Sequence, residues 1–210
     1  MKRRVILVGI PGVGKTTVIR DLQLLAEEEK LPCKVVNFGT VMMEIAKETI
    51  KDRDKIREAP IEAQHELQRK VAEAIAQERT EGVLIVDTHL IIKTGSGYLP
   101  GIPYHVLQGL KPDMIALVEG TPEEILLRRS SDTSRKRDFK AYVIPQIGNS
   151  RSGDSSWEVS PIRDVEDDLQ FSRVIAFACA TLAGIPLGIV WNRAGRQLEA
   201  ARQLLAMIKD

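Results

Sequence analysis

The stretch that decides the fold is Gly9-Ile10-Pro11-Gly12-Val13-Gly14-Lys15-Thr16-Thr17. It follows directly on the apolar run Val5–Val8, and a segment with helical periodicity covers Thr16–Glu29. A glycine, four residues, a second glycine, lysine and threonine between a strand and a helix form the P-loop pattern, whose backbone N–H groups surround phosphates. The sequence therefore predicts a site for a nucleoside triphosphate.

Each kind of residue in this loop has an expected role. The glycines let the backbone approach phosphates closely, and the N-terminus of the following helix adds a partial positive charge. Lys15 is expected to reach the outer phosphates, and the hydroxyl of Thr16 is expected to bind Mg²⁺. The residues predicted to hold the triphosphate are Gly9, Pro11, Gly12, Val13, Gly14, Lys15, Thr16 and Thr17.

Short apolar runs rich in β-branched residues recur along the chain, at Val5–Val8, Lys34–Phe38, Val83–Asp87, Met114–Val118 and Leu187–Trp191. Segments of helical periodicity separate them. This alternation predicts an α/β fold, a three-layer domain whose five-stranded parallel sheet is flanked by helices on both faces. Ligands bind beyond the carboxyl ends of such strands, so one cleft is expected at Gly9, Asn37–Thr40, Asp87–His89, Glu119 and Asn192.

The helical segments carry recognisable ends and faces. Pro60–Glu81 is the longest, and its proline suits a first helical position. Thr121-Pro122-Glu123-Glu124 is a capping box that predicts the start of another helix. The segment Val165–Leu182 is expected to bury an apolar face made of Phe171, Val174, Ile175 and Ala178.

Composition narrows the class of protein. A chain of 210 residues supports one well-buried core, and 30 basic against 29 acidic side chains create no global field for nucleic acid or membrane. Cys33 and Cys179 are far apart, which favours neither a disulfide framework nor a structural zinc site. The apolar run near the N-terminus is too short for a signal peptide, and no run has transmembrane length. We expect a cytoplasmic protein with no membrane contact and no nucleic-acid surface.

Asp87 ends an apolar strand, and this arrangement favours a carboxylate beside the Mg²⁺ held near Thr16. Thr88 and His89 follow it, so the glutamate that would orient water in a hydrolytic ATPase is missing. The N-K-x-D sequence of GTPases and the H-R-D and D-F-G motifs of protein kinases are also absent from the sequence. His89, at the end of this strand, is a candidate for the lining of an acceptor pocket.

The chain contains more arginine residues than its fold alone would require. Guanidinium groups neutralise phosphates and hold their oxygens in line, as two phosphate-bearing substrates would require. An acceptor that is itself a phosphate is already anionic, so the reaction needs no general base. The candidate arginines are Arg57, Arg129, Arg135, Arg137 and Arg173.

The chain resembles the archaeal-type adenylate kinases in segments that occur in the same order over nearly its whole length. The segments are Gly9–Thr17, Val36–Met42, Asp52–Asp54 with Arg57, Asp87–His89, Lys93–Pro103, Arg129–Thr133 and Arg137-Asp138. The sequences N-F-G-T-V-M and G-Y-L-P-G are the most specific of them. The resemblance implies a reversible, Mg²⁺-dependent phosphoryl transfer in which ATP and AMP give two ADP.

The resemblance also implies roles for individual residues. Thr40 and Arg57 would bind AMP, and Lys93 stands where other members have a basic residue near the AMP phosphate. Arg129 would stack near the adenine of the donor, and Asn192 would offer backbone contacts to the donor base. The remaining roles are those of lid arginines, Arg135 and Arg137, of Arg173, which completes the cluster, and of Asp87, which organises Mg²⁺ through water.

The expected organisation is a single P-loop kinase domain over residues 1–210, with an acceptor segment at 37–81 and a lid at 128–164. The lid carries an insertion at about 139–162, which we interpret as a tolerated surface loop. The resemblance favours a homo-oligomer and makes a trimer the expected form. Two alternatives stay open, namely a kinase for another nucleoside monophosphate and a P-loop switch that acts in RNA or ribosome assembly.

Overall fold

A five-stranded parallel sheet forms the centre of the part of the chain that the computed structural model describes, residues 2–47, 59–94, 97–131 and 161–210. Its strand order is β2-β3-β1-β6-β7, and every neighbouring pair is parallel. The strands are β1 (Arg3–Val8), β2 (Cys33–Asn37), β3 (Val83–Asp87), β6 (Met114–Glu119) and β7 (Leu187–Trp191). The predicted strands and their parallel arrangement are confirmed.

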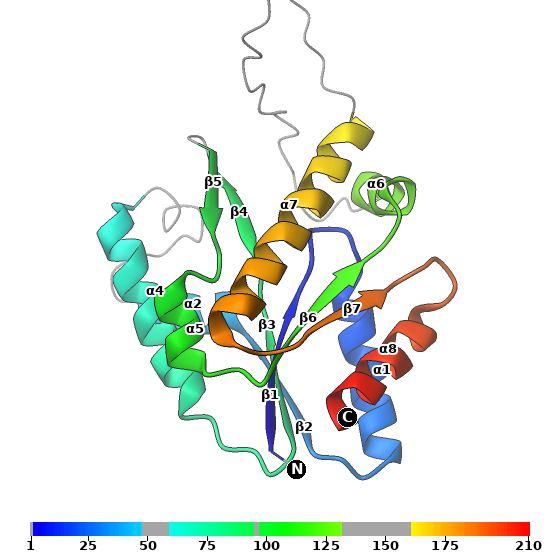
Figure 1. Cartoon of the computed structure of the whole chain (residues 1–210), viewed down its shortest axis with the longest axis horizontal. Coiled ribbons are helices and arrows are strands. Elements are labelled where there is room, and N and C mark those ends of the chain that lie inside the picture. The colour runs from blue at the N-terminus through cyan, green and yellow to red at the C-terminus, as the bar shows by residue number, and fades with distance from the viewer. Residues whose placement is uncertain (1, 48–58, 95–96, 132–160) are drawn as a thin grey trace, which may run out of the picture.

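Helices cover both faces of this sheet, as the predicted three-layer fold requires (Figure 1). One face carries α1 (Lys15–Glu28) and α8 (Gln197–Lys209). The other carries α2 (Phe38–Ala46), α4 (Ile61–Ala76), α5 (Tyr104–Leu110) and most of α7 (Pro161–Ala183). Helix α6 (Pro122–Ser131) follows β6 and packs against α7. No helix within the described ranges combines the length and the apolar character that crossing a membrane would need.

The central strand β1 is buried on both faces. Val5 and Leu7 pack in the cluster formed with α1 and α8, whereas Ile6 and Val8 pack in the cluster formed with α4, α5 and α7. Each of these four side chains has no exposed surface. A strand of a covered parallel sheet therefore reads as a continuous apolar run and lacks the polar alternation of a half-exposed strand.

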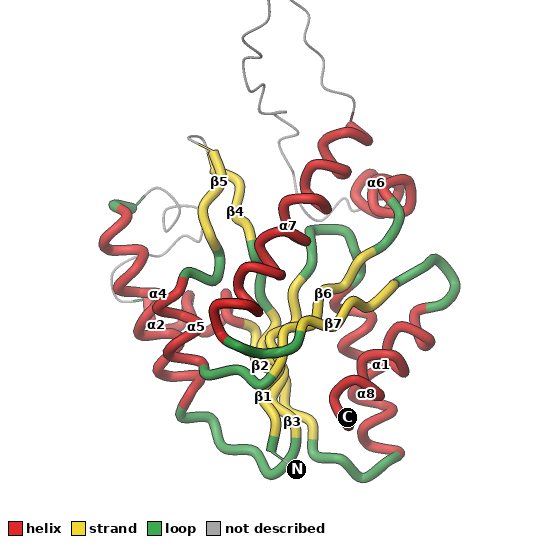
Figure 2. Tube along the Cα trace, viewed as in Figure 1, coloured by secondary structure: helices red, strands yellow, loops and turns green. Residues whose placement is uncertain are grey.

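Two helices and a hairpin were not among the predicted elements. Helices α2 and α5 are short, and β4 (Ile91–Thr94) pairs antiparallel with β5 (Gly97–Pro100) in a separate two-stranded sheet (Figure 2). The pairing continues one residue beyond the two strands, because Gly101 N donates to Leu90 O at 2.7 Å. Elements of four to nine residues leave too little periodicity to be recognised from the sequence.

The ends of two helices test the predicted boundaries. Thr121 Oγ1 accepts from Glu124 N at 3.3 Å, which confirms the predicted cap at the start of α6. Helix α4 begins after Pro60, as expected, but it ends at Ala76 and not at Glu81. The last residues of that segment turn toward β3, and Gly82 O accepts from Arg3 N at 3.1 Å.

The predicted buried face of α7 is wrong at three of its four residues, and only Ile175 is half-buried against the core. Phe171, Val174 and Ala178 are exposed, and Val174 keeps 63% of its surface. The buried residues of this helix are small or polar: Val165, Asp168, Ser172, Ala176, Cys179 and Ala180. Small side chains let the helix approach the sheet closely, and Asp168 is buried because it pairs with an arginine of α6.

Candidate active site

Three of the strand ends that were predicted to converge, those of β1, β2 and β3, lie side by side. Asn37 and Asp87 are register partners at the ends of β2 and β3, and Leu7 of β1 is the partner of Asp87 on its other side. The connection from β1 passes through α1 to one edge of the sheet, whereas the chain leaving β3 continues to β6 on the opposite side of β1. Such a switch in strand order opens a crevice for a ligand.

Two glycines of the loop hold backbone conformations that other residues rarely adopt. Gly12 has φ 87° and Gly14 has φ 93°. A Cβ atom at Gly12 would lie 2.8 Å from Cγ of Arg129, and one at Gly14 would collide with Nδ2 of Asn192. The loop therefore requires glycine at both positions for its conformation and for its close packing.

Every second carbonyl group of the loop accepts a hydrogen bond from a side chain, and the donors belong to α1, to α6 and to the end of β7. Gly9 O accepts from Lys15 Nζ at 3.3 Å, Pro11 O accepts from an arginine of α6, and Val13 O accepts from Asn192 Nδ2 at 2.8 Å. Binding these carbonyl groups from inside the protein turns the N–H side of the loop toward a ligand. This is the arrangement that an anion needs.

The N-terminus of α1 suits the same anion. Its N-cap is Gly14, which supplies no side-chain acceptor, and no acidic residue lies in the first turn. The first N–H groups of the helix therefore have no side-chain cap, and the helix dipole favours a negative charge there. Lys15 adds a cation at the first helical position, and the side chain of Thr16 is exposed beside it.

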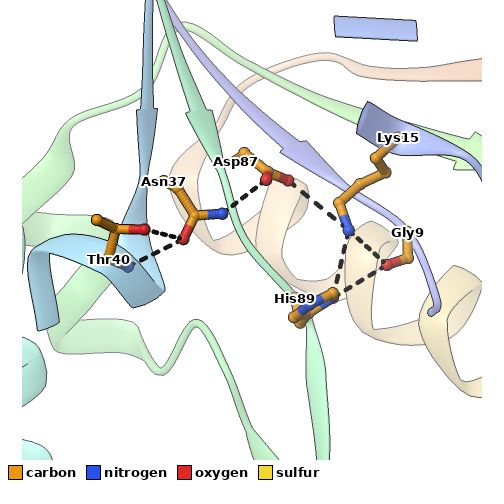
Figure 3. A network of polar contacts seen from close by, with 6 residues as sticks. All are labelled: Gly9, Lys15, Asn37, Thr40, Asp87 and His89. Carbon is orange, nitrogen blue, oxygen red and sulfur yellow. Dashed lines mark hydrogen bonds and ion pairs between the residues drawn. The ribbon is translucent and has the colours of Figure 1, made fainter. Parts of the chain in front are cut away.

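Lys15 stands at the centre of a polar network (Figure 3). Its Nζ lies 3.3 Å from Gly9 O, 3.4 Å from Nδ1 of His89 and 3.7 Å from Oδ1 of Asp87. The same Nδ1 lies 3.3 Å from Gly9 O, so it either donates to that carbonyl or accepts from the lysine, depending on its tautomer. The network brings four of the predicted site residues together, Gly9, Lys15, Asp87 and His89, and Lys15 is buried in it.

Asp87 and Thr40 are joined through Asn37 (Figure 3). Asn37 Nδ2 donates to Asp87 Oδ2 at 2.7 Å. Asn37 Oδ1 accepts from the backbone N–H of Thr40 at 2.9 Å and from the Thr40 hydroxyl at 3.2 Å, which makes Asn37 the N-cap of α2. Thr40 was predicted on the acceptor side and Asp87 on the metal side, so the structure places the two sides next to each other.

The residues predicted for Mg²⁺ fit a magnesium ion that is shared with a nucleotide. Oδ1 of Asp87 is buried without a hydrogen-bond partner and keeps lone pairs for a metal-bound water. Thr16 supplies a hydroxyl oxygen in the first turn of α1. Magnesium usually takes one or two protein oxygens and completes its shell with phosphate oxygens and water. This explains why no group of three metal-ligating side chains is found among the described residues.

Arg129 connects the loop to α7. Its Nε donates to Pro11 O at 2.8 Å, and its NH2 group donates to Oδ2 of Asp168 at 3.0 Å. A second carboxylate, that of Asp164, lies 3.9 Å from the NH1 group. The guanidinium is buried between these partners, and its predicted stacking on a donor base stays a prediction.

Arg128, the neighbour of Arg129, is also bound to the loop. Its NH1 group donates to Val13 O at 3.1 Å, and its NH2 group donates to Asn192 O at 3.4 Å. Asn192 N in turn donates to Glu119 O at 2.8 Å. The ends of β6 and β7 are thereby joined to the P-loop, as the predicted convergence of strand ends requires.

Arg173 of α7 forms a two-pronged ion pair with Glu119 at the end of β6. Its Nε donates to Oε1 at 2.8 Å and its NH2 group donates to Oε2 at 2.5 Å. The hydrogen bonds to Glu119 raise the pKa of Arg173, and the negative charge of the carboxylate acts in the same direction. The carboxylate is almost fully buried, whereas the arginine side chain keeps 55% of its surface.

Some predicted site residues lie outside the described residues. These are Arg57, Arg135 and Arg137, together with the insertion up to residue 160. The backbone of Lys93 belongs to β4, but its side chain is outside the description. Their roles stay predictions.

Sequence reasoning missed four side chains that shape the site, namely Asn37, Glu119, Arg128 and Asp168. Asn37 and Glu119 were expected only as strand ends, and their partners depend on sheet register and helix placement. An asparagine directly before a helix is a recognisable N-cap signal, so a prediction of α2 would have identified Asn37. Arg128 and Asp168 have no local signal of this kind.

Comparison with known proteins agrees with this geometry. Residues 8–142 match the family model described as AAA domain. The chain is 38% identical over 212 aligned residues to the adenylate kinase of Methanocaldococcus jannaschii, with 100% of both chains covered. It is 37% identical over 205 residues to the adenylate kinase of Sulfurisphaera tokodaii, covering 95% of this chain and 96% of the relative.

A solved structure supports the fold. The shikimate kinase from Acinetobacter baumannii, in complex with shikimate, matches with a TM-score of 0.54 and 15% identity, covering 100% of this chain and 94% of that one. The parallel sheet and the P-loop define a P-loop protein with the α/β architecture that this kinase also has. The similarity of the whole chain to the two adenylate kinases identifies the family more specifically than the fold does. The chain belongs to the adenylate kinase family.

Proposed function

We propose that this chain is an adenylate kinase, a phosphotransferase that moves the terminal phosphoryl group of ATP to AMP and forms two ADP. One observation carries the proposal: the P-loop lysine and the start of the acceptor helix lie at one edge of the sheet, joined through Asp87 and Asn37. The similarity of the whole chain to adenylate kinases supports the same reaction.

The transfer is a single displacement at phosphorus. An oxygen of the AMP phosphate forms a bond to the γ-phosphorus of ATP, the bond from that phosphorus to the β–γ bridging oxygen breaks, and ADP leaves. The attacking phosphate is anionic and requires no base, so the protein contributes positioning and positive charge. Lys15 and the N–H groups of the loop are the groups that we expect to follow the transferred phosphoryl.

On the donor side, Gly9 to Thr17 are proposed to bind the ATP phosphates, with Asn192 near the donor base. Mg²⁺ bound with ATP would offset the charge of the outer phosphates. Thr16 and Asp87 are the residues proposed to hold it, the latter through water, because both supply oxygen ligands next to the loop.

On the acceptor side, Thr40, Arg57, His89 and Lys93 are proposed to bind AMP within the segment 37–81 and the hairpin that follows β3. The contact of His89 with Lys15 supports this assignment, because it places the imidazole beside the loop. Arg129, Arg135, Arg137 and Arg173 are proposed to surround the transferring phosphate, partly from the lid at 128–164.

We also propose that the chain forms a homo-oligomer through α7, with a second copy of itself as the partner. Val174, Phe177 and Leu182 are 63%, 67% and 63% exposed. Tyr98 of β5 extends this surface through a ring contact of 5.3 Å with Phe171. The sequence holds no charged residue between Arg173 and Arg193, and depletion of charge is typical of interface cores. A trimer is the expected form by resemblance alone.

The acceptor is tested with purified protein, ATP, Mg²⁺ and one monophosphate at a time, namely AMP, CMP, UMP or GMP, with nucleotides separated by anion exchange. We expect ADP to form with AMP and little product with the other three. Arg57→Ala should abolish the transfer while leaving ATP affinity close to that of the wild type. Equal turnover in this variant would refute the assignment of Arg57, and a preference for another monophosphate would refute AMP as the acceptor.

A further inference from the structure

Asn37 connects the two halves of the site through one side chain. Its Nδ2 group donates to Asp87 Oδ2 at 2.7 Å, and its Oδ1 atom accepts from the N–H of Thr40 at 2.9 Å. Asp87 is the proposed metal-side carboxylate, and Thr40 lies in the first turn of the proposed acceptor helix α2. Two consecutive hydrogen bonds therefore separate the acceptor helix from the carboxylate beside the P-loop (Figure 3).

The two partners determine the orientation of the Asn37 amide. In the reverse orientation, its NH₂ group would face the backbone N–H of Thr40, and its carbonyl oxygen would face the Asp87 carboxylate. Both contacts would then be repulsive, so the amide has one favourable orientation. The side chain is therefore a spacer of defined orientation between helix and carboxylate.

The spacer also determines how Asp87 is presented. Because Asn37 binds Oδ2, the other oxygen, Oδ1, faces Lys15 Nζ at 3.7 Å and has no hydrogen-bond partner. A carboxylate held by one oxygen cannot rotate freely, and its second oxygen stays directed toward the phosphate side of the site.

We propose that Asn37 is a positioning residue that couples the acceptor helix to the phosphoryl-transfer centre by orienting Asp87. The proposal rests on the proposed function, since it assigns the acceptor to α2 and the metal to Asp87. Any displacement of the first turn of α2 on acceptor binding moves the Asn37 amide and, with it, Asp87. Asn37 thus does more than cap a helix.

Three substitutions separate the cap from the coupling. Asn37→Ser keeps a good N-cap but is too short to reach Asp87. Asn37→Asp keeps the cap and places a second carboxylate against Asp87, whereas Asn37→Ala removes both contacts. The matched control is Asp113→Ala, which removes a hydrogen bond of 2.6 Å from Arg4 N at the opposite, amino-terminal edge of the sheet.

The kinetic readout is the split between kcat and the KM for AMP. For Asn37→Ser we expect a KM near the wild-type value and a kcat lower by about tenfold. For Asn37→Asp we expect a kcat lower by about a hundredfold. Both values lie in the range typical of residues that orient a metal ligand. Asn37→Ala should impair KM and kcat together. Asp113→Ala should keep both constants, and combining Asn37→Ser with Asp87→Asn should slow the enzyme no further than Asp87→Asn alone.

A second readout needs no turnover. Calorimetry without any acceptor gives the affinity for ATP with and without Mg²⁺. The gain from Mg²⁺, meaning the increase in ATP affinity when Mg²⁺ is added, should be smaller in Asn37→Ser than in the wild type. Wild-type kcat and wild-type gain from Mg²⁺ in Asn37→Ser would overturn the proposal and leave Asn37 as a helix cap only. Failure of the proposed function is distinguishable, because the wild type itself would then transfer no phosphoryl group to AMP while the calorimetric comparison would still decide the coupling.

Discussion

Gly14 begins α1 in the left-handed region, with φ 93°, and packs directly against the side chain of Asn192. Gly14→Ala should therefore distort the loop, lower the free energy of unfolding by about 2 kcal/mol and weaken ATP binding strongly. Gly195→Ala is the matched control, because Gly195 has φ 74° but nothing within 4 Å of an added Cβ. Gly195→Ala should lower the free energy of unfolding by about 1 kcal/mol and leave ATP affinity unchanged. Urea unfolding and ATP titration of both variants check this, and equal ATP affinities would contradict it.

Asp168 and Arg129 form a buried ion pair, with side chains 5% and 6% exposed. Removing Asp168 leaves the buried guanidinium with only the more distant carboxylate of Asp164, so Asp168→Ala should lower the free energy of unfolding by about 3 kcal/mol. Glu73→Ala removes a helix-surface pair with Arg69 whose side chains are about half exposed, and it should lower the free energy of unfolding far less, because solvent screens the two charges. Denaturant unfolding measures both, and similar losses in the two variants would contradict the assigned importance of burial.

At the scale of single residues, the sequence predicts the site where chemistry depends on local pattern. The P-loop glycines, Lys15 and Asp87 stand in a recognisable order along the chain, and the structure brings Lys15 and Asp87 together. The contact of Asn37 with Asp87 could not be predicted, because it depends on the register of two strands whose residues are 50 positions apart.

At the scale of elements, the buried strands were predictable and one helix face was not. Strands covered on both sides show continuous apolar runs, and β3 and β7 begin and end where the sequence indicates. In α7 the large side chains of Phe171, Val174, Phe177 and Leu182 are exposed and mostly small side chains are buried, because close approach to a covered sheet favours small residues. Hydrophobic periodicity finds such a helix but assigns its buried face incorrectly.

The packing of α4 against α5 should make stability depend on pH. His65 and His105 have ring centroids 5.1 Å apart. Burial lowers the pKa of His105 below its ordinary value of 6.5, and the charges of His65 and Arg69 add to the effect. Below pH 6.5 the unfolded chain therefore binds a proton that the folded chain does not bind, so stability falls as pH drops from 6.5 toward the lowered pKa of the folded state.

Urea midpoints between neutral pH and about pH 5 measure this dependence. His105→Gln removes the titrating group and should show a smaller decline over the same interval. A decline of the same size in this variant would assign the pH dependence to other groups.

At the scale of the whole molecule, the exposed apolar face of α7 should determine assembly. Phe177→Glu places a charge in the middle of this face and should convert the homo-oligomer into monomers, as measured by size-exclusion chromatography with light scattering. Leu24→Glu alters a side chain of α1 that is 55% exposed, on the opposite face of the sheet, and should leave the assembly unchanged. A monomeric wild type, or an oligomer that survives Phe177→Glu, would contradict this interface.

The central claim is that one crevice holds two nucleotides and passes a phosphoryl group between them. The most direct measurement supplies purified protein with ADP and Mg²⁺ alone and follows the nucleotides by ³¹P NMR or anion exchange. The account predicts that ADP is converted to equal amounts of ATP and AMP, and that Lys15→Met stops the conversion while the protein stays folded. Release of free phosphate, or no change in ADP with the wild-type protein, would contradict it.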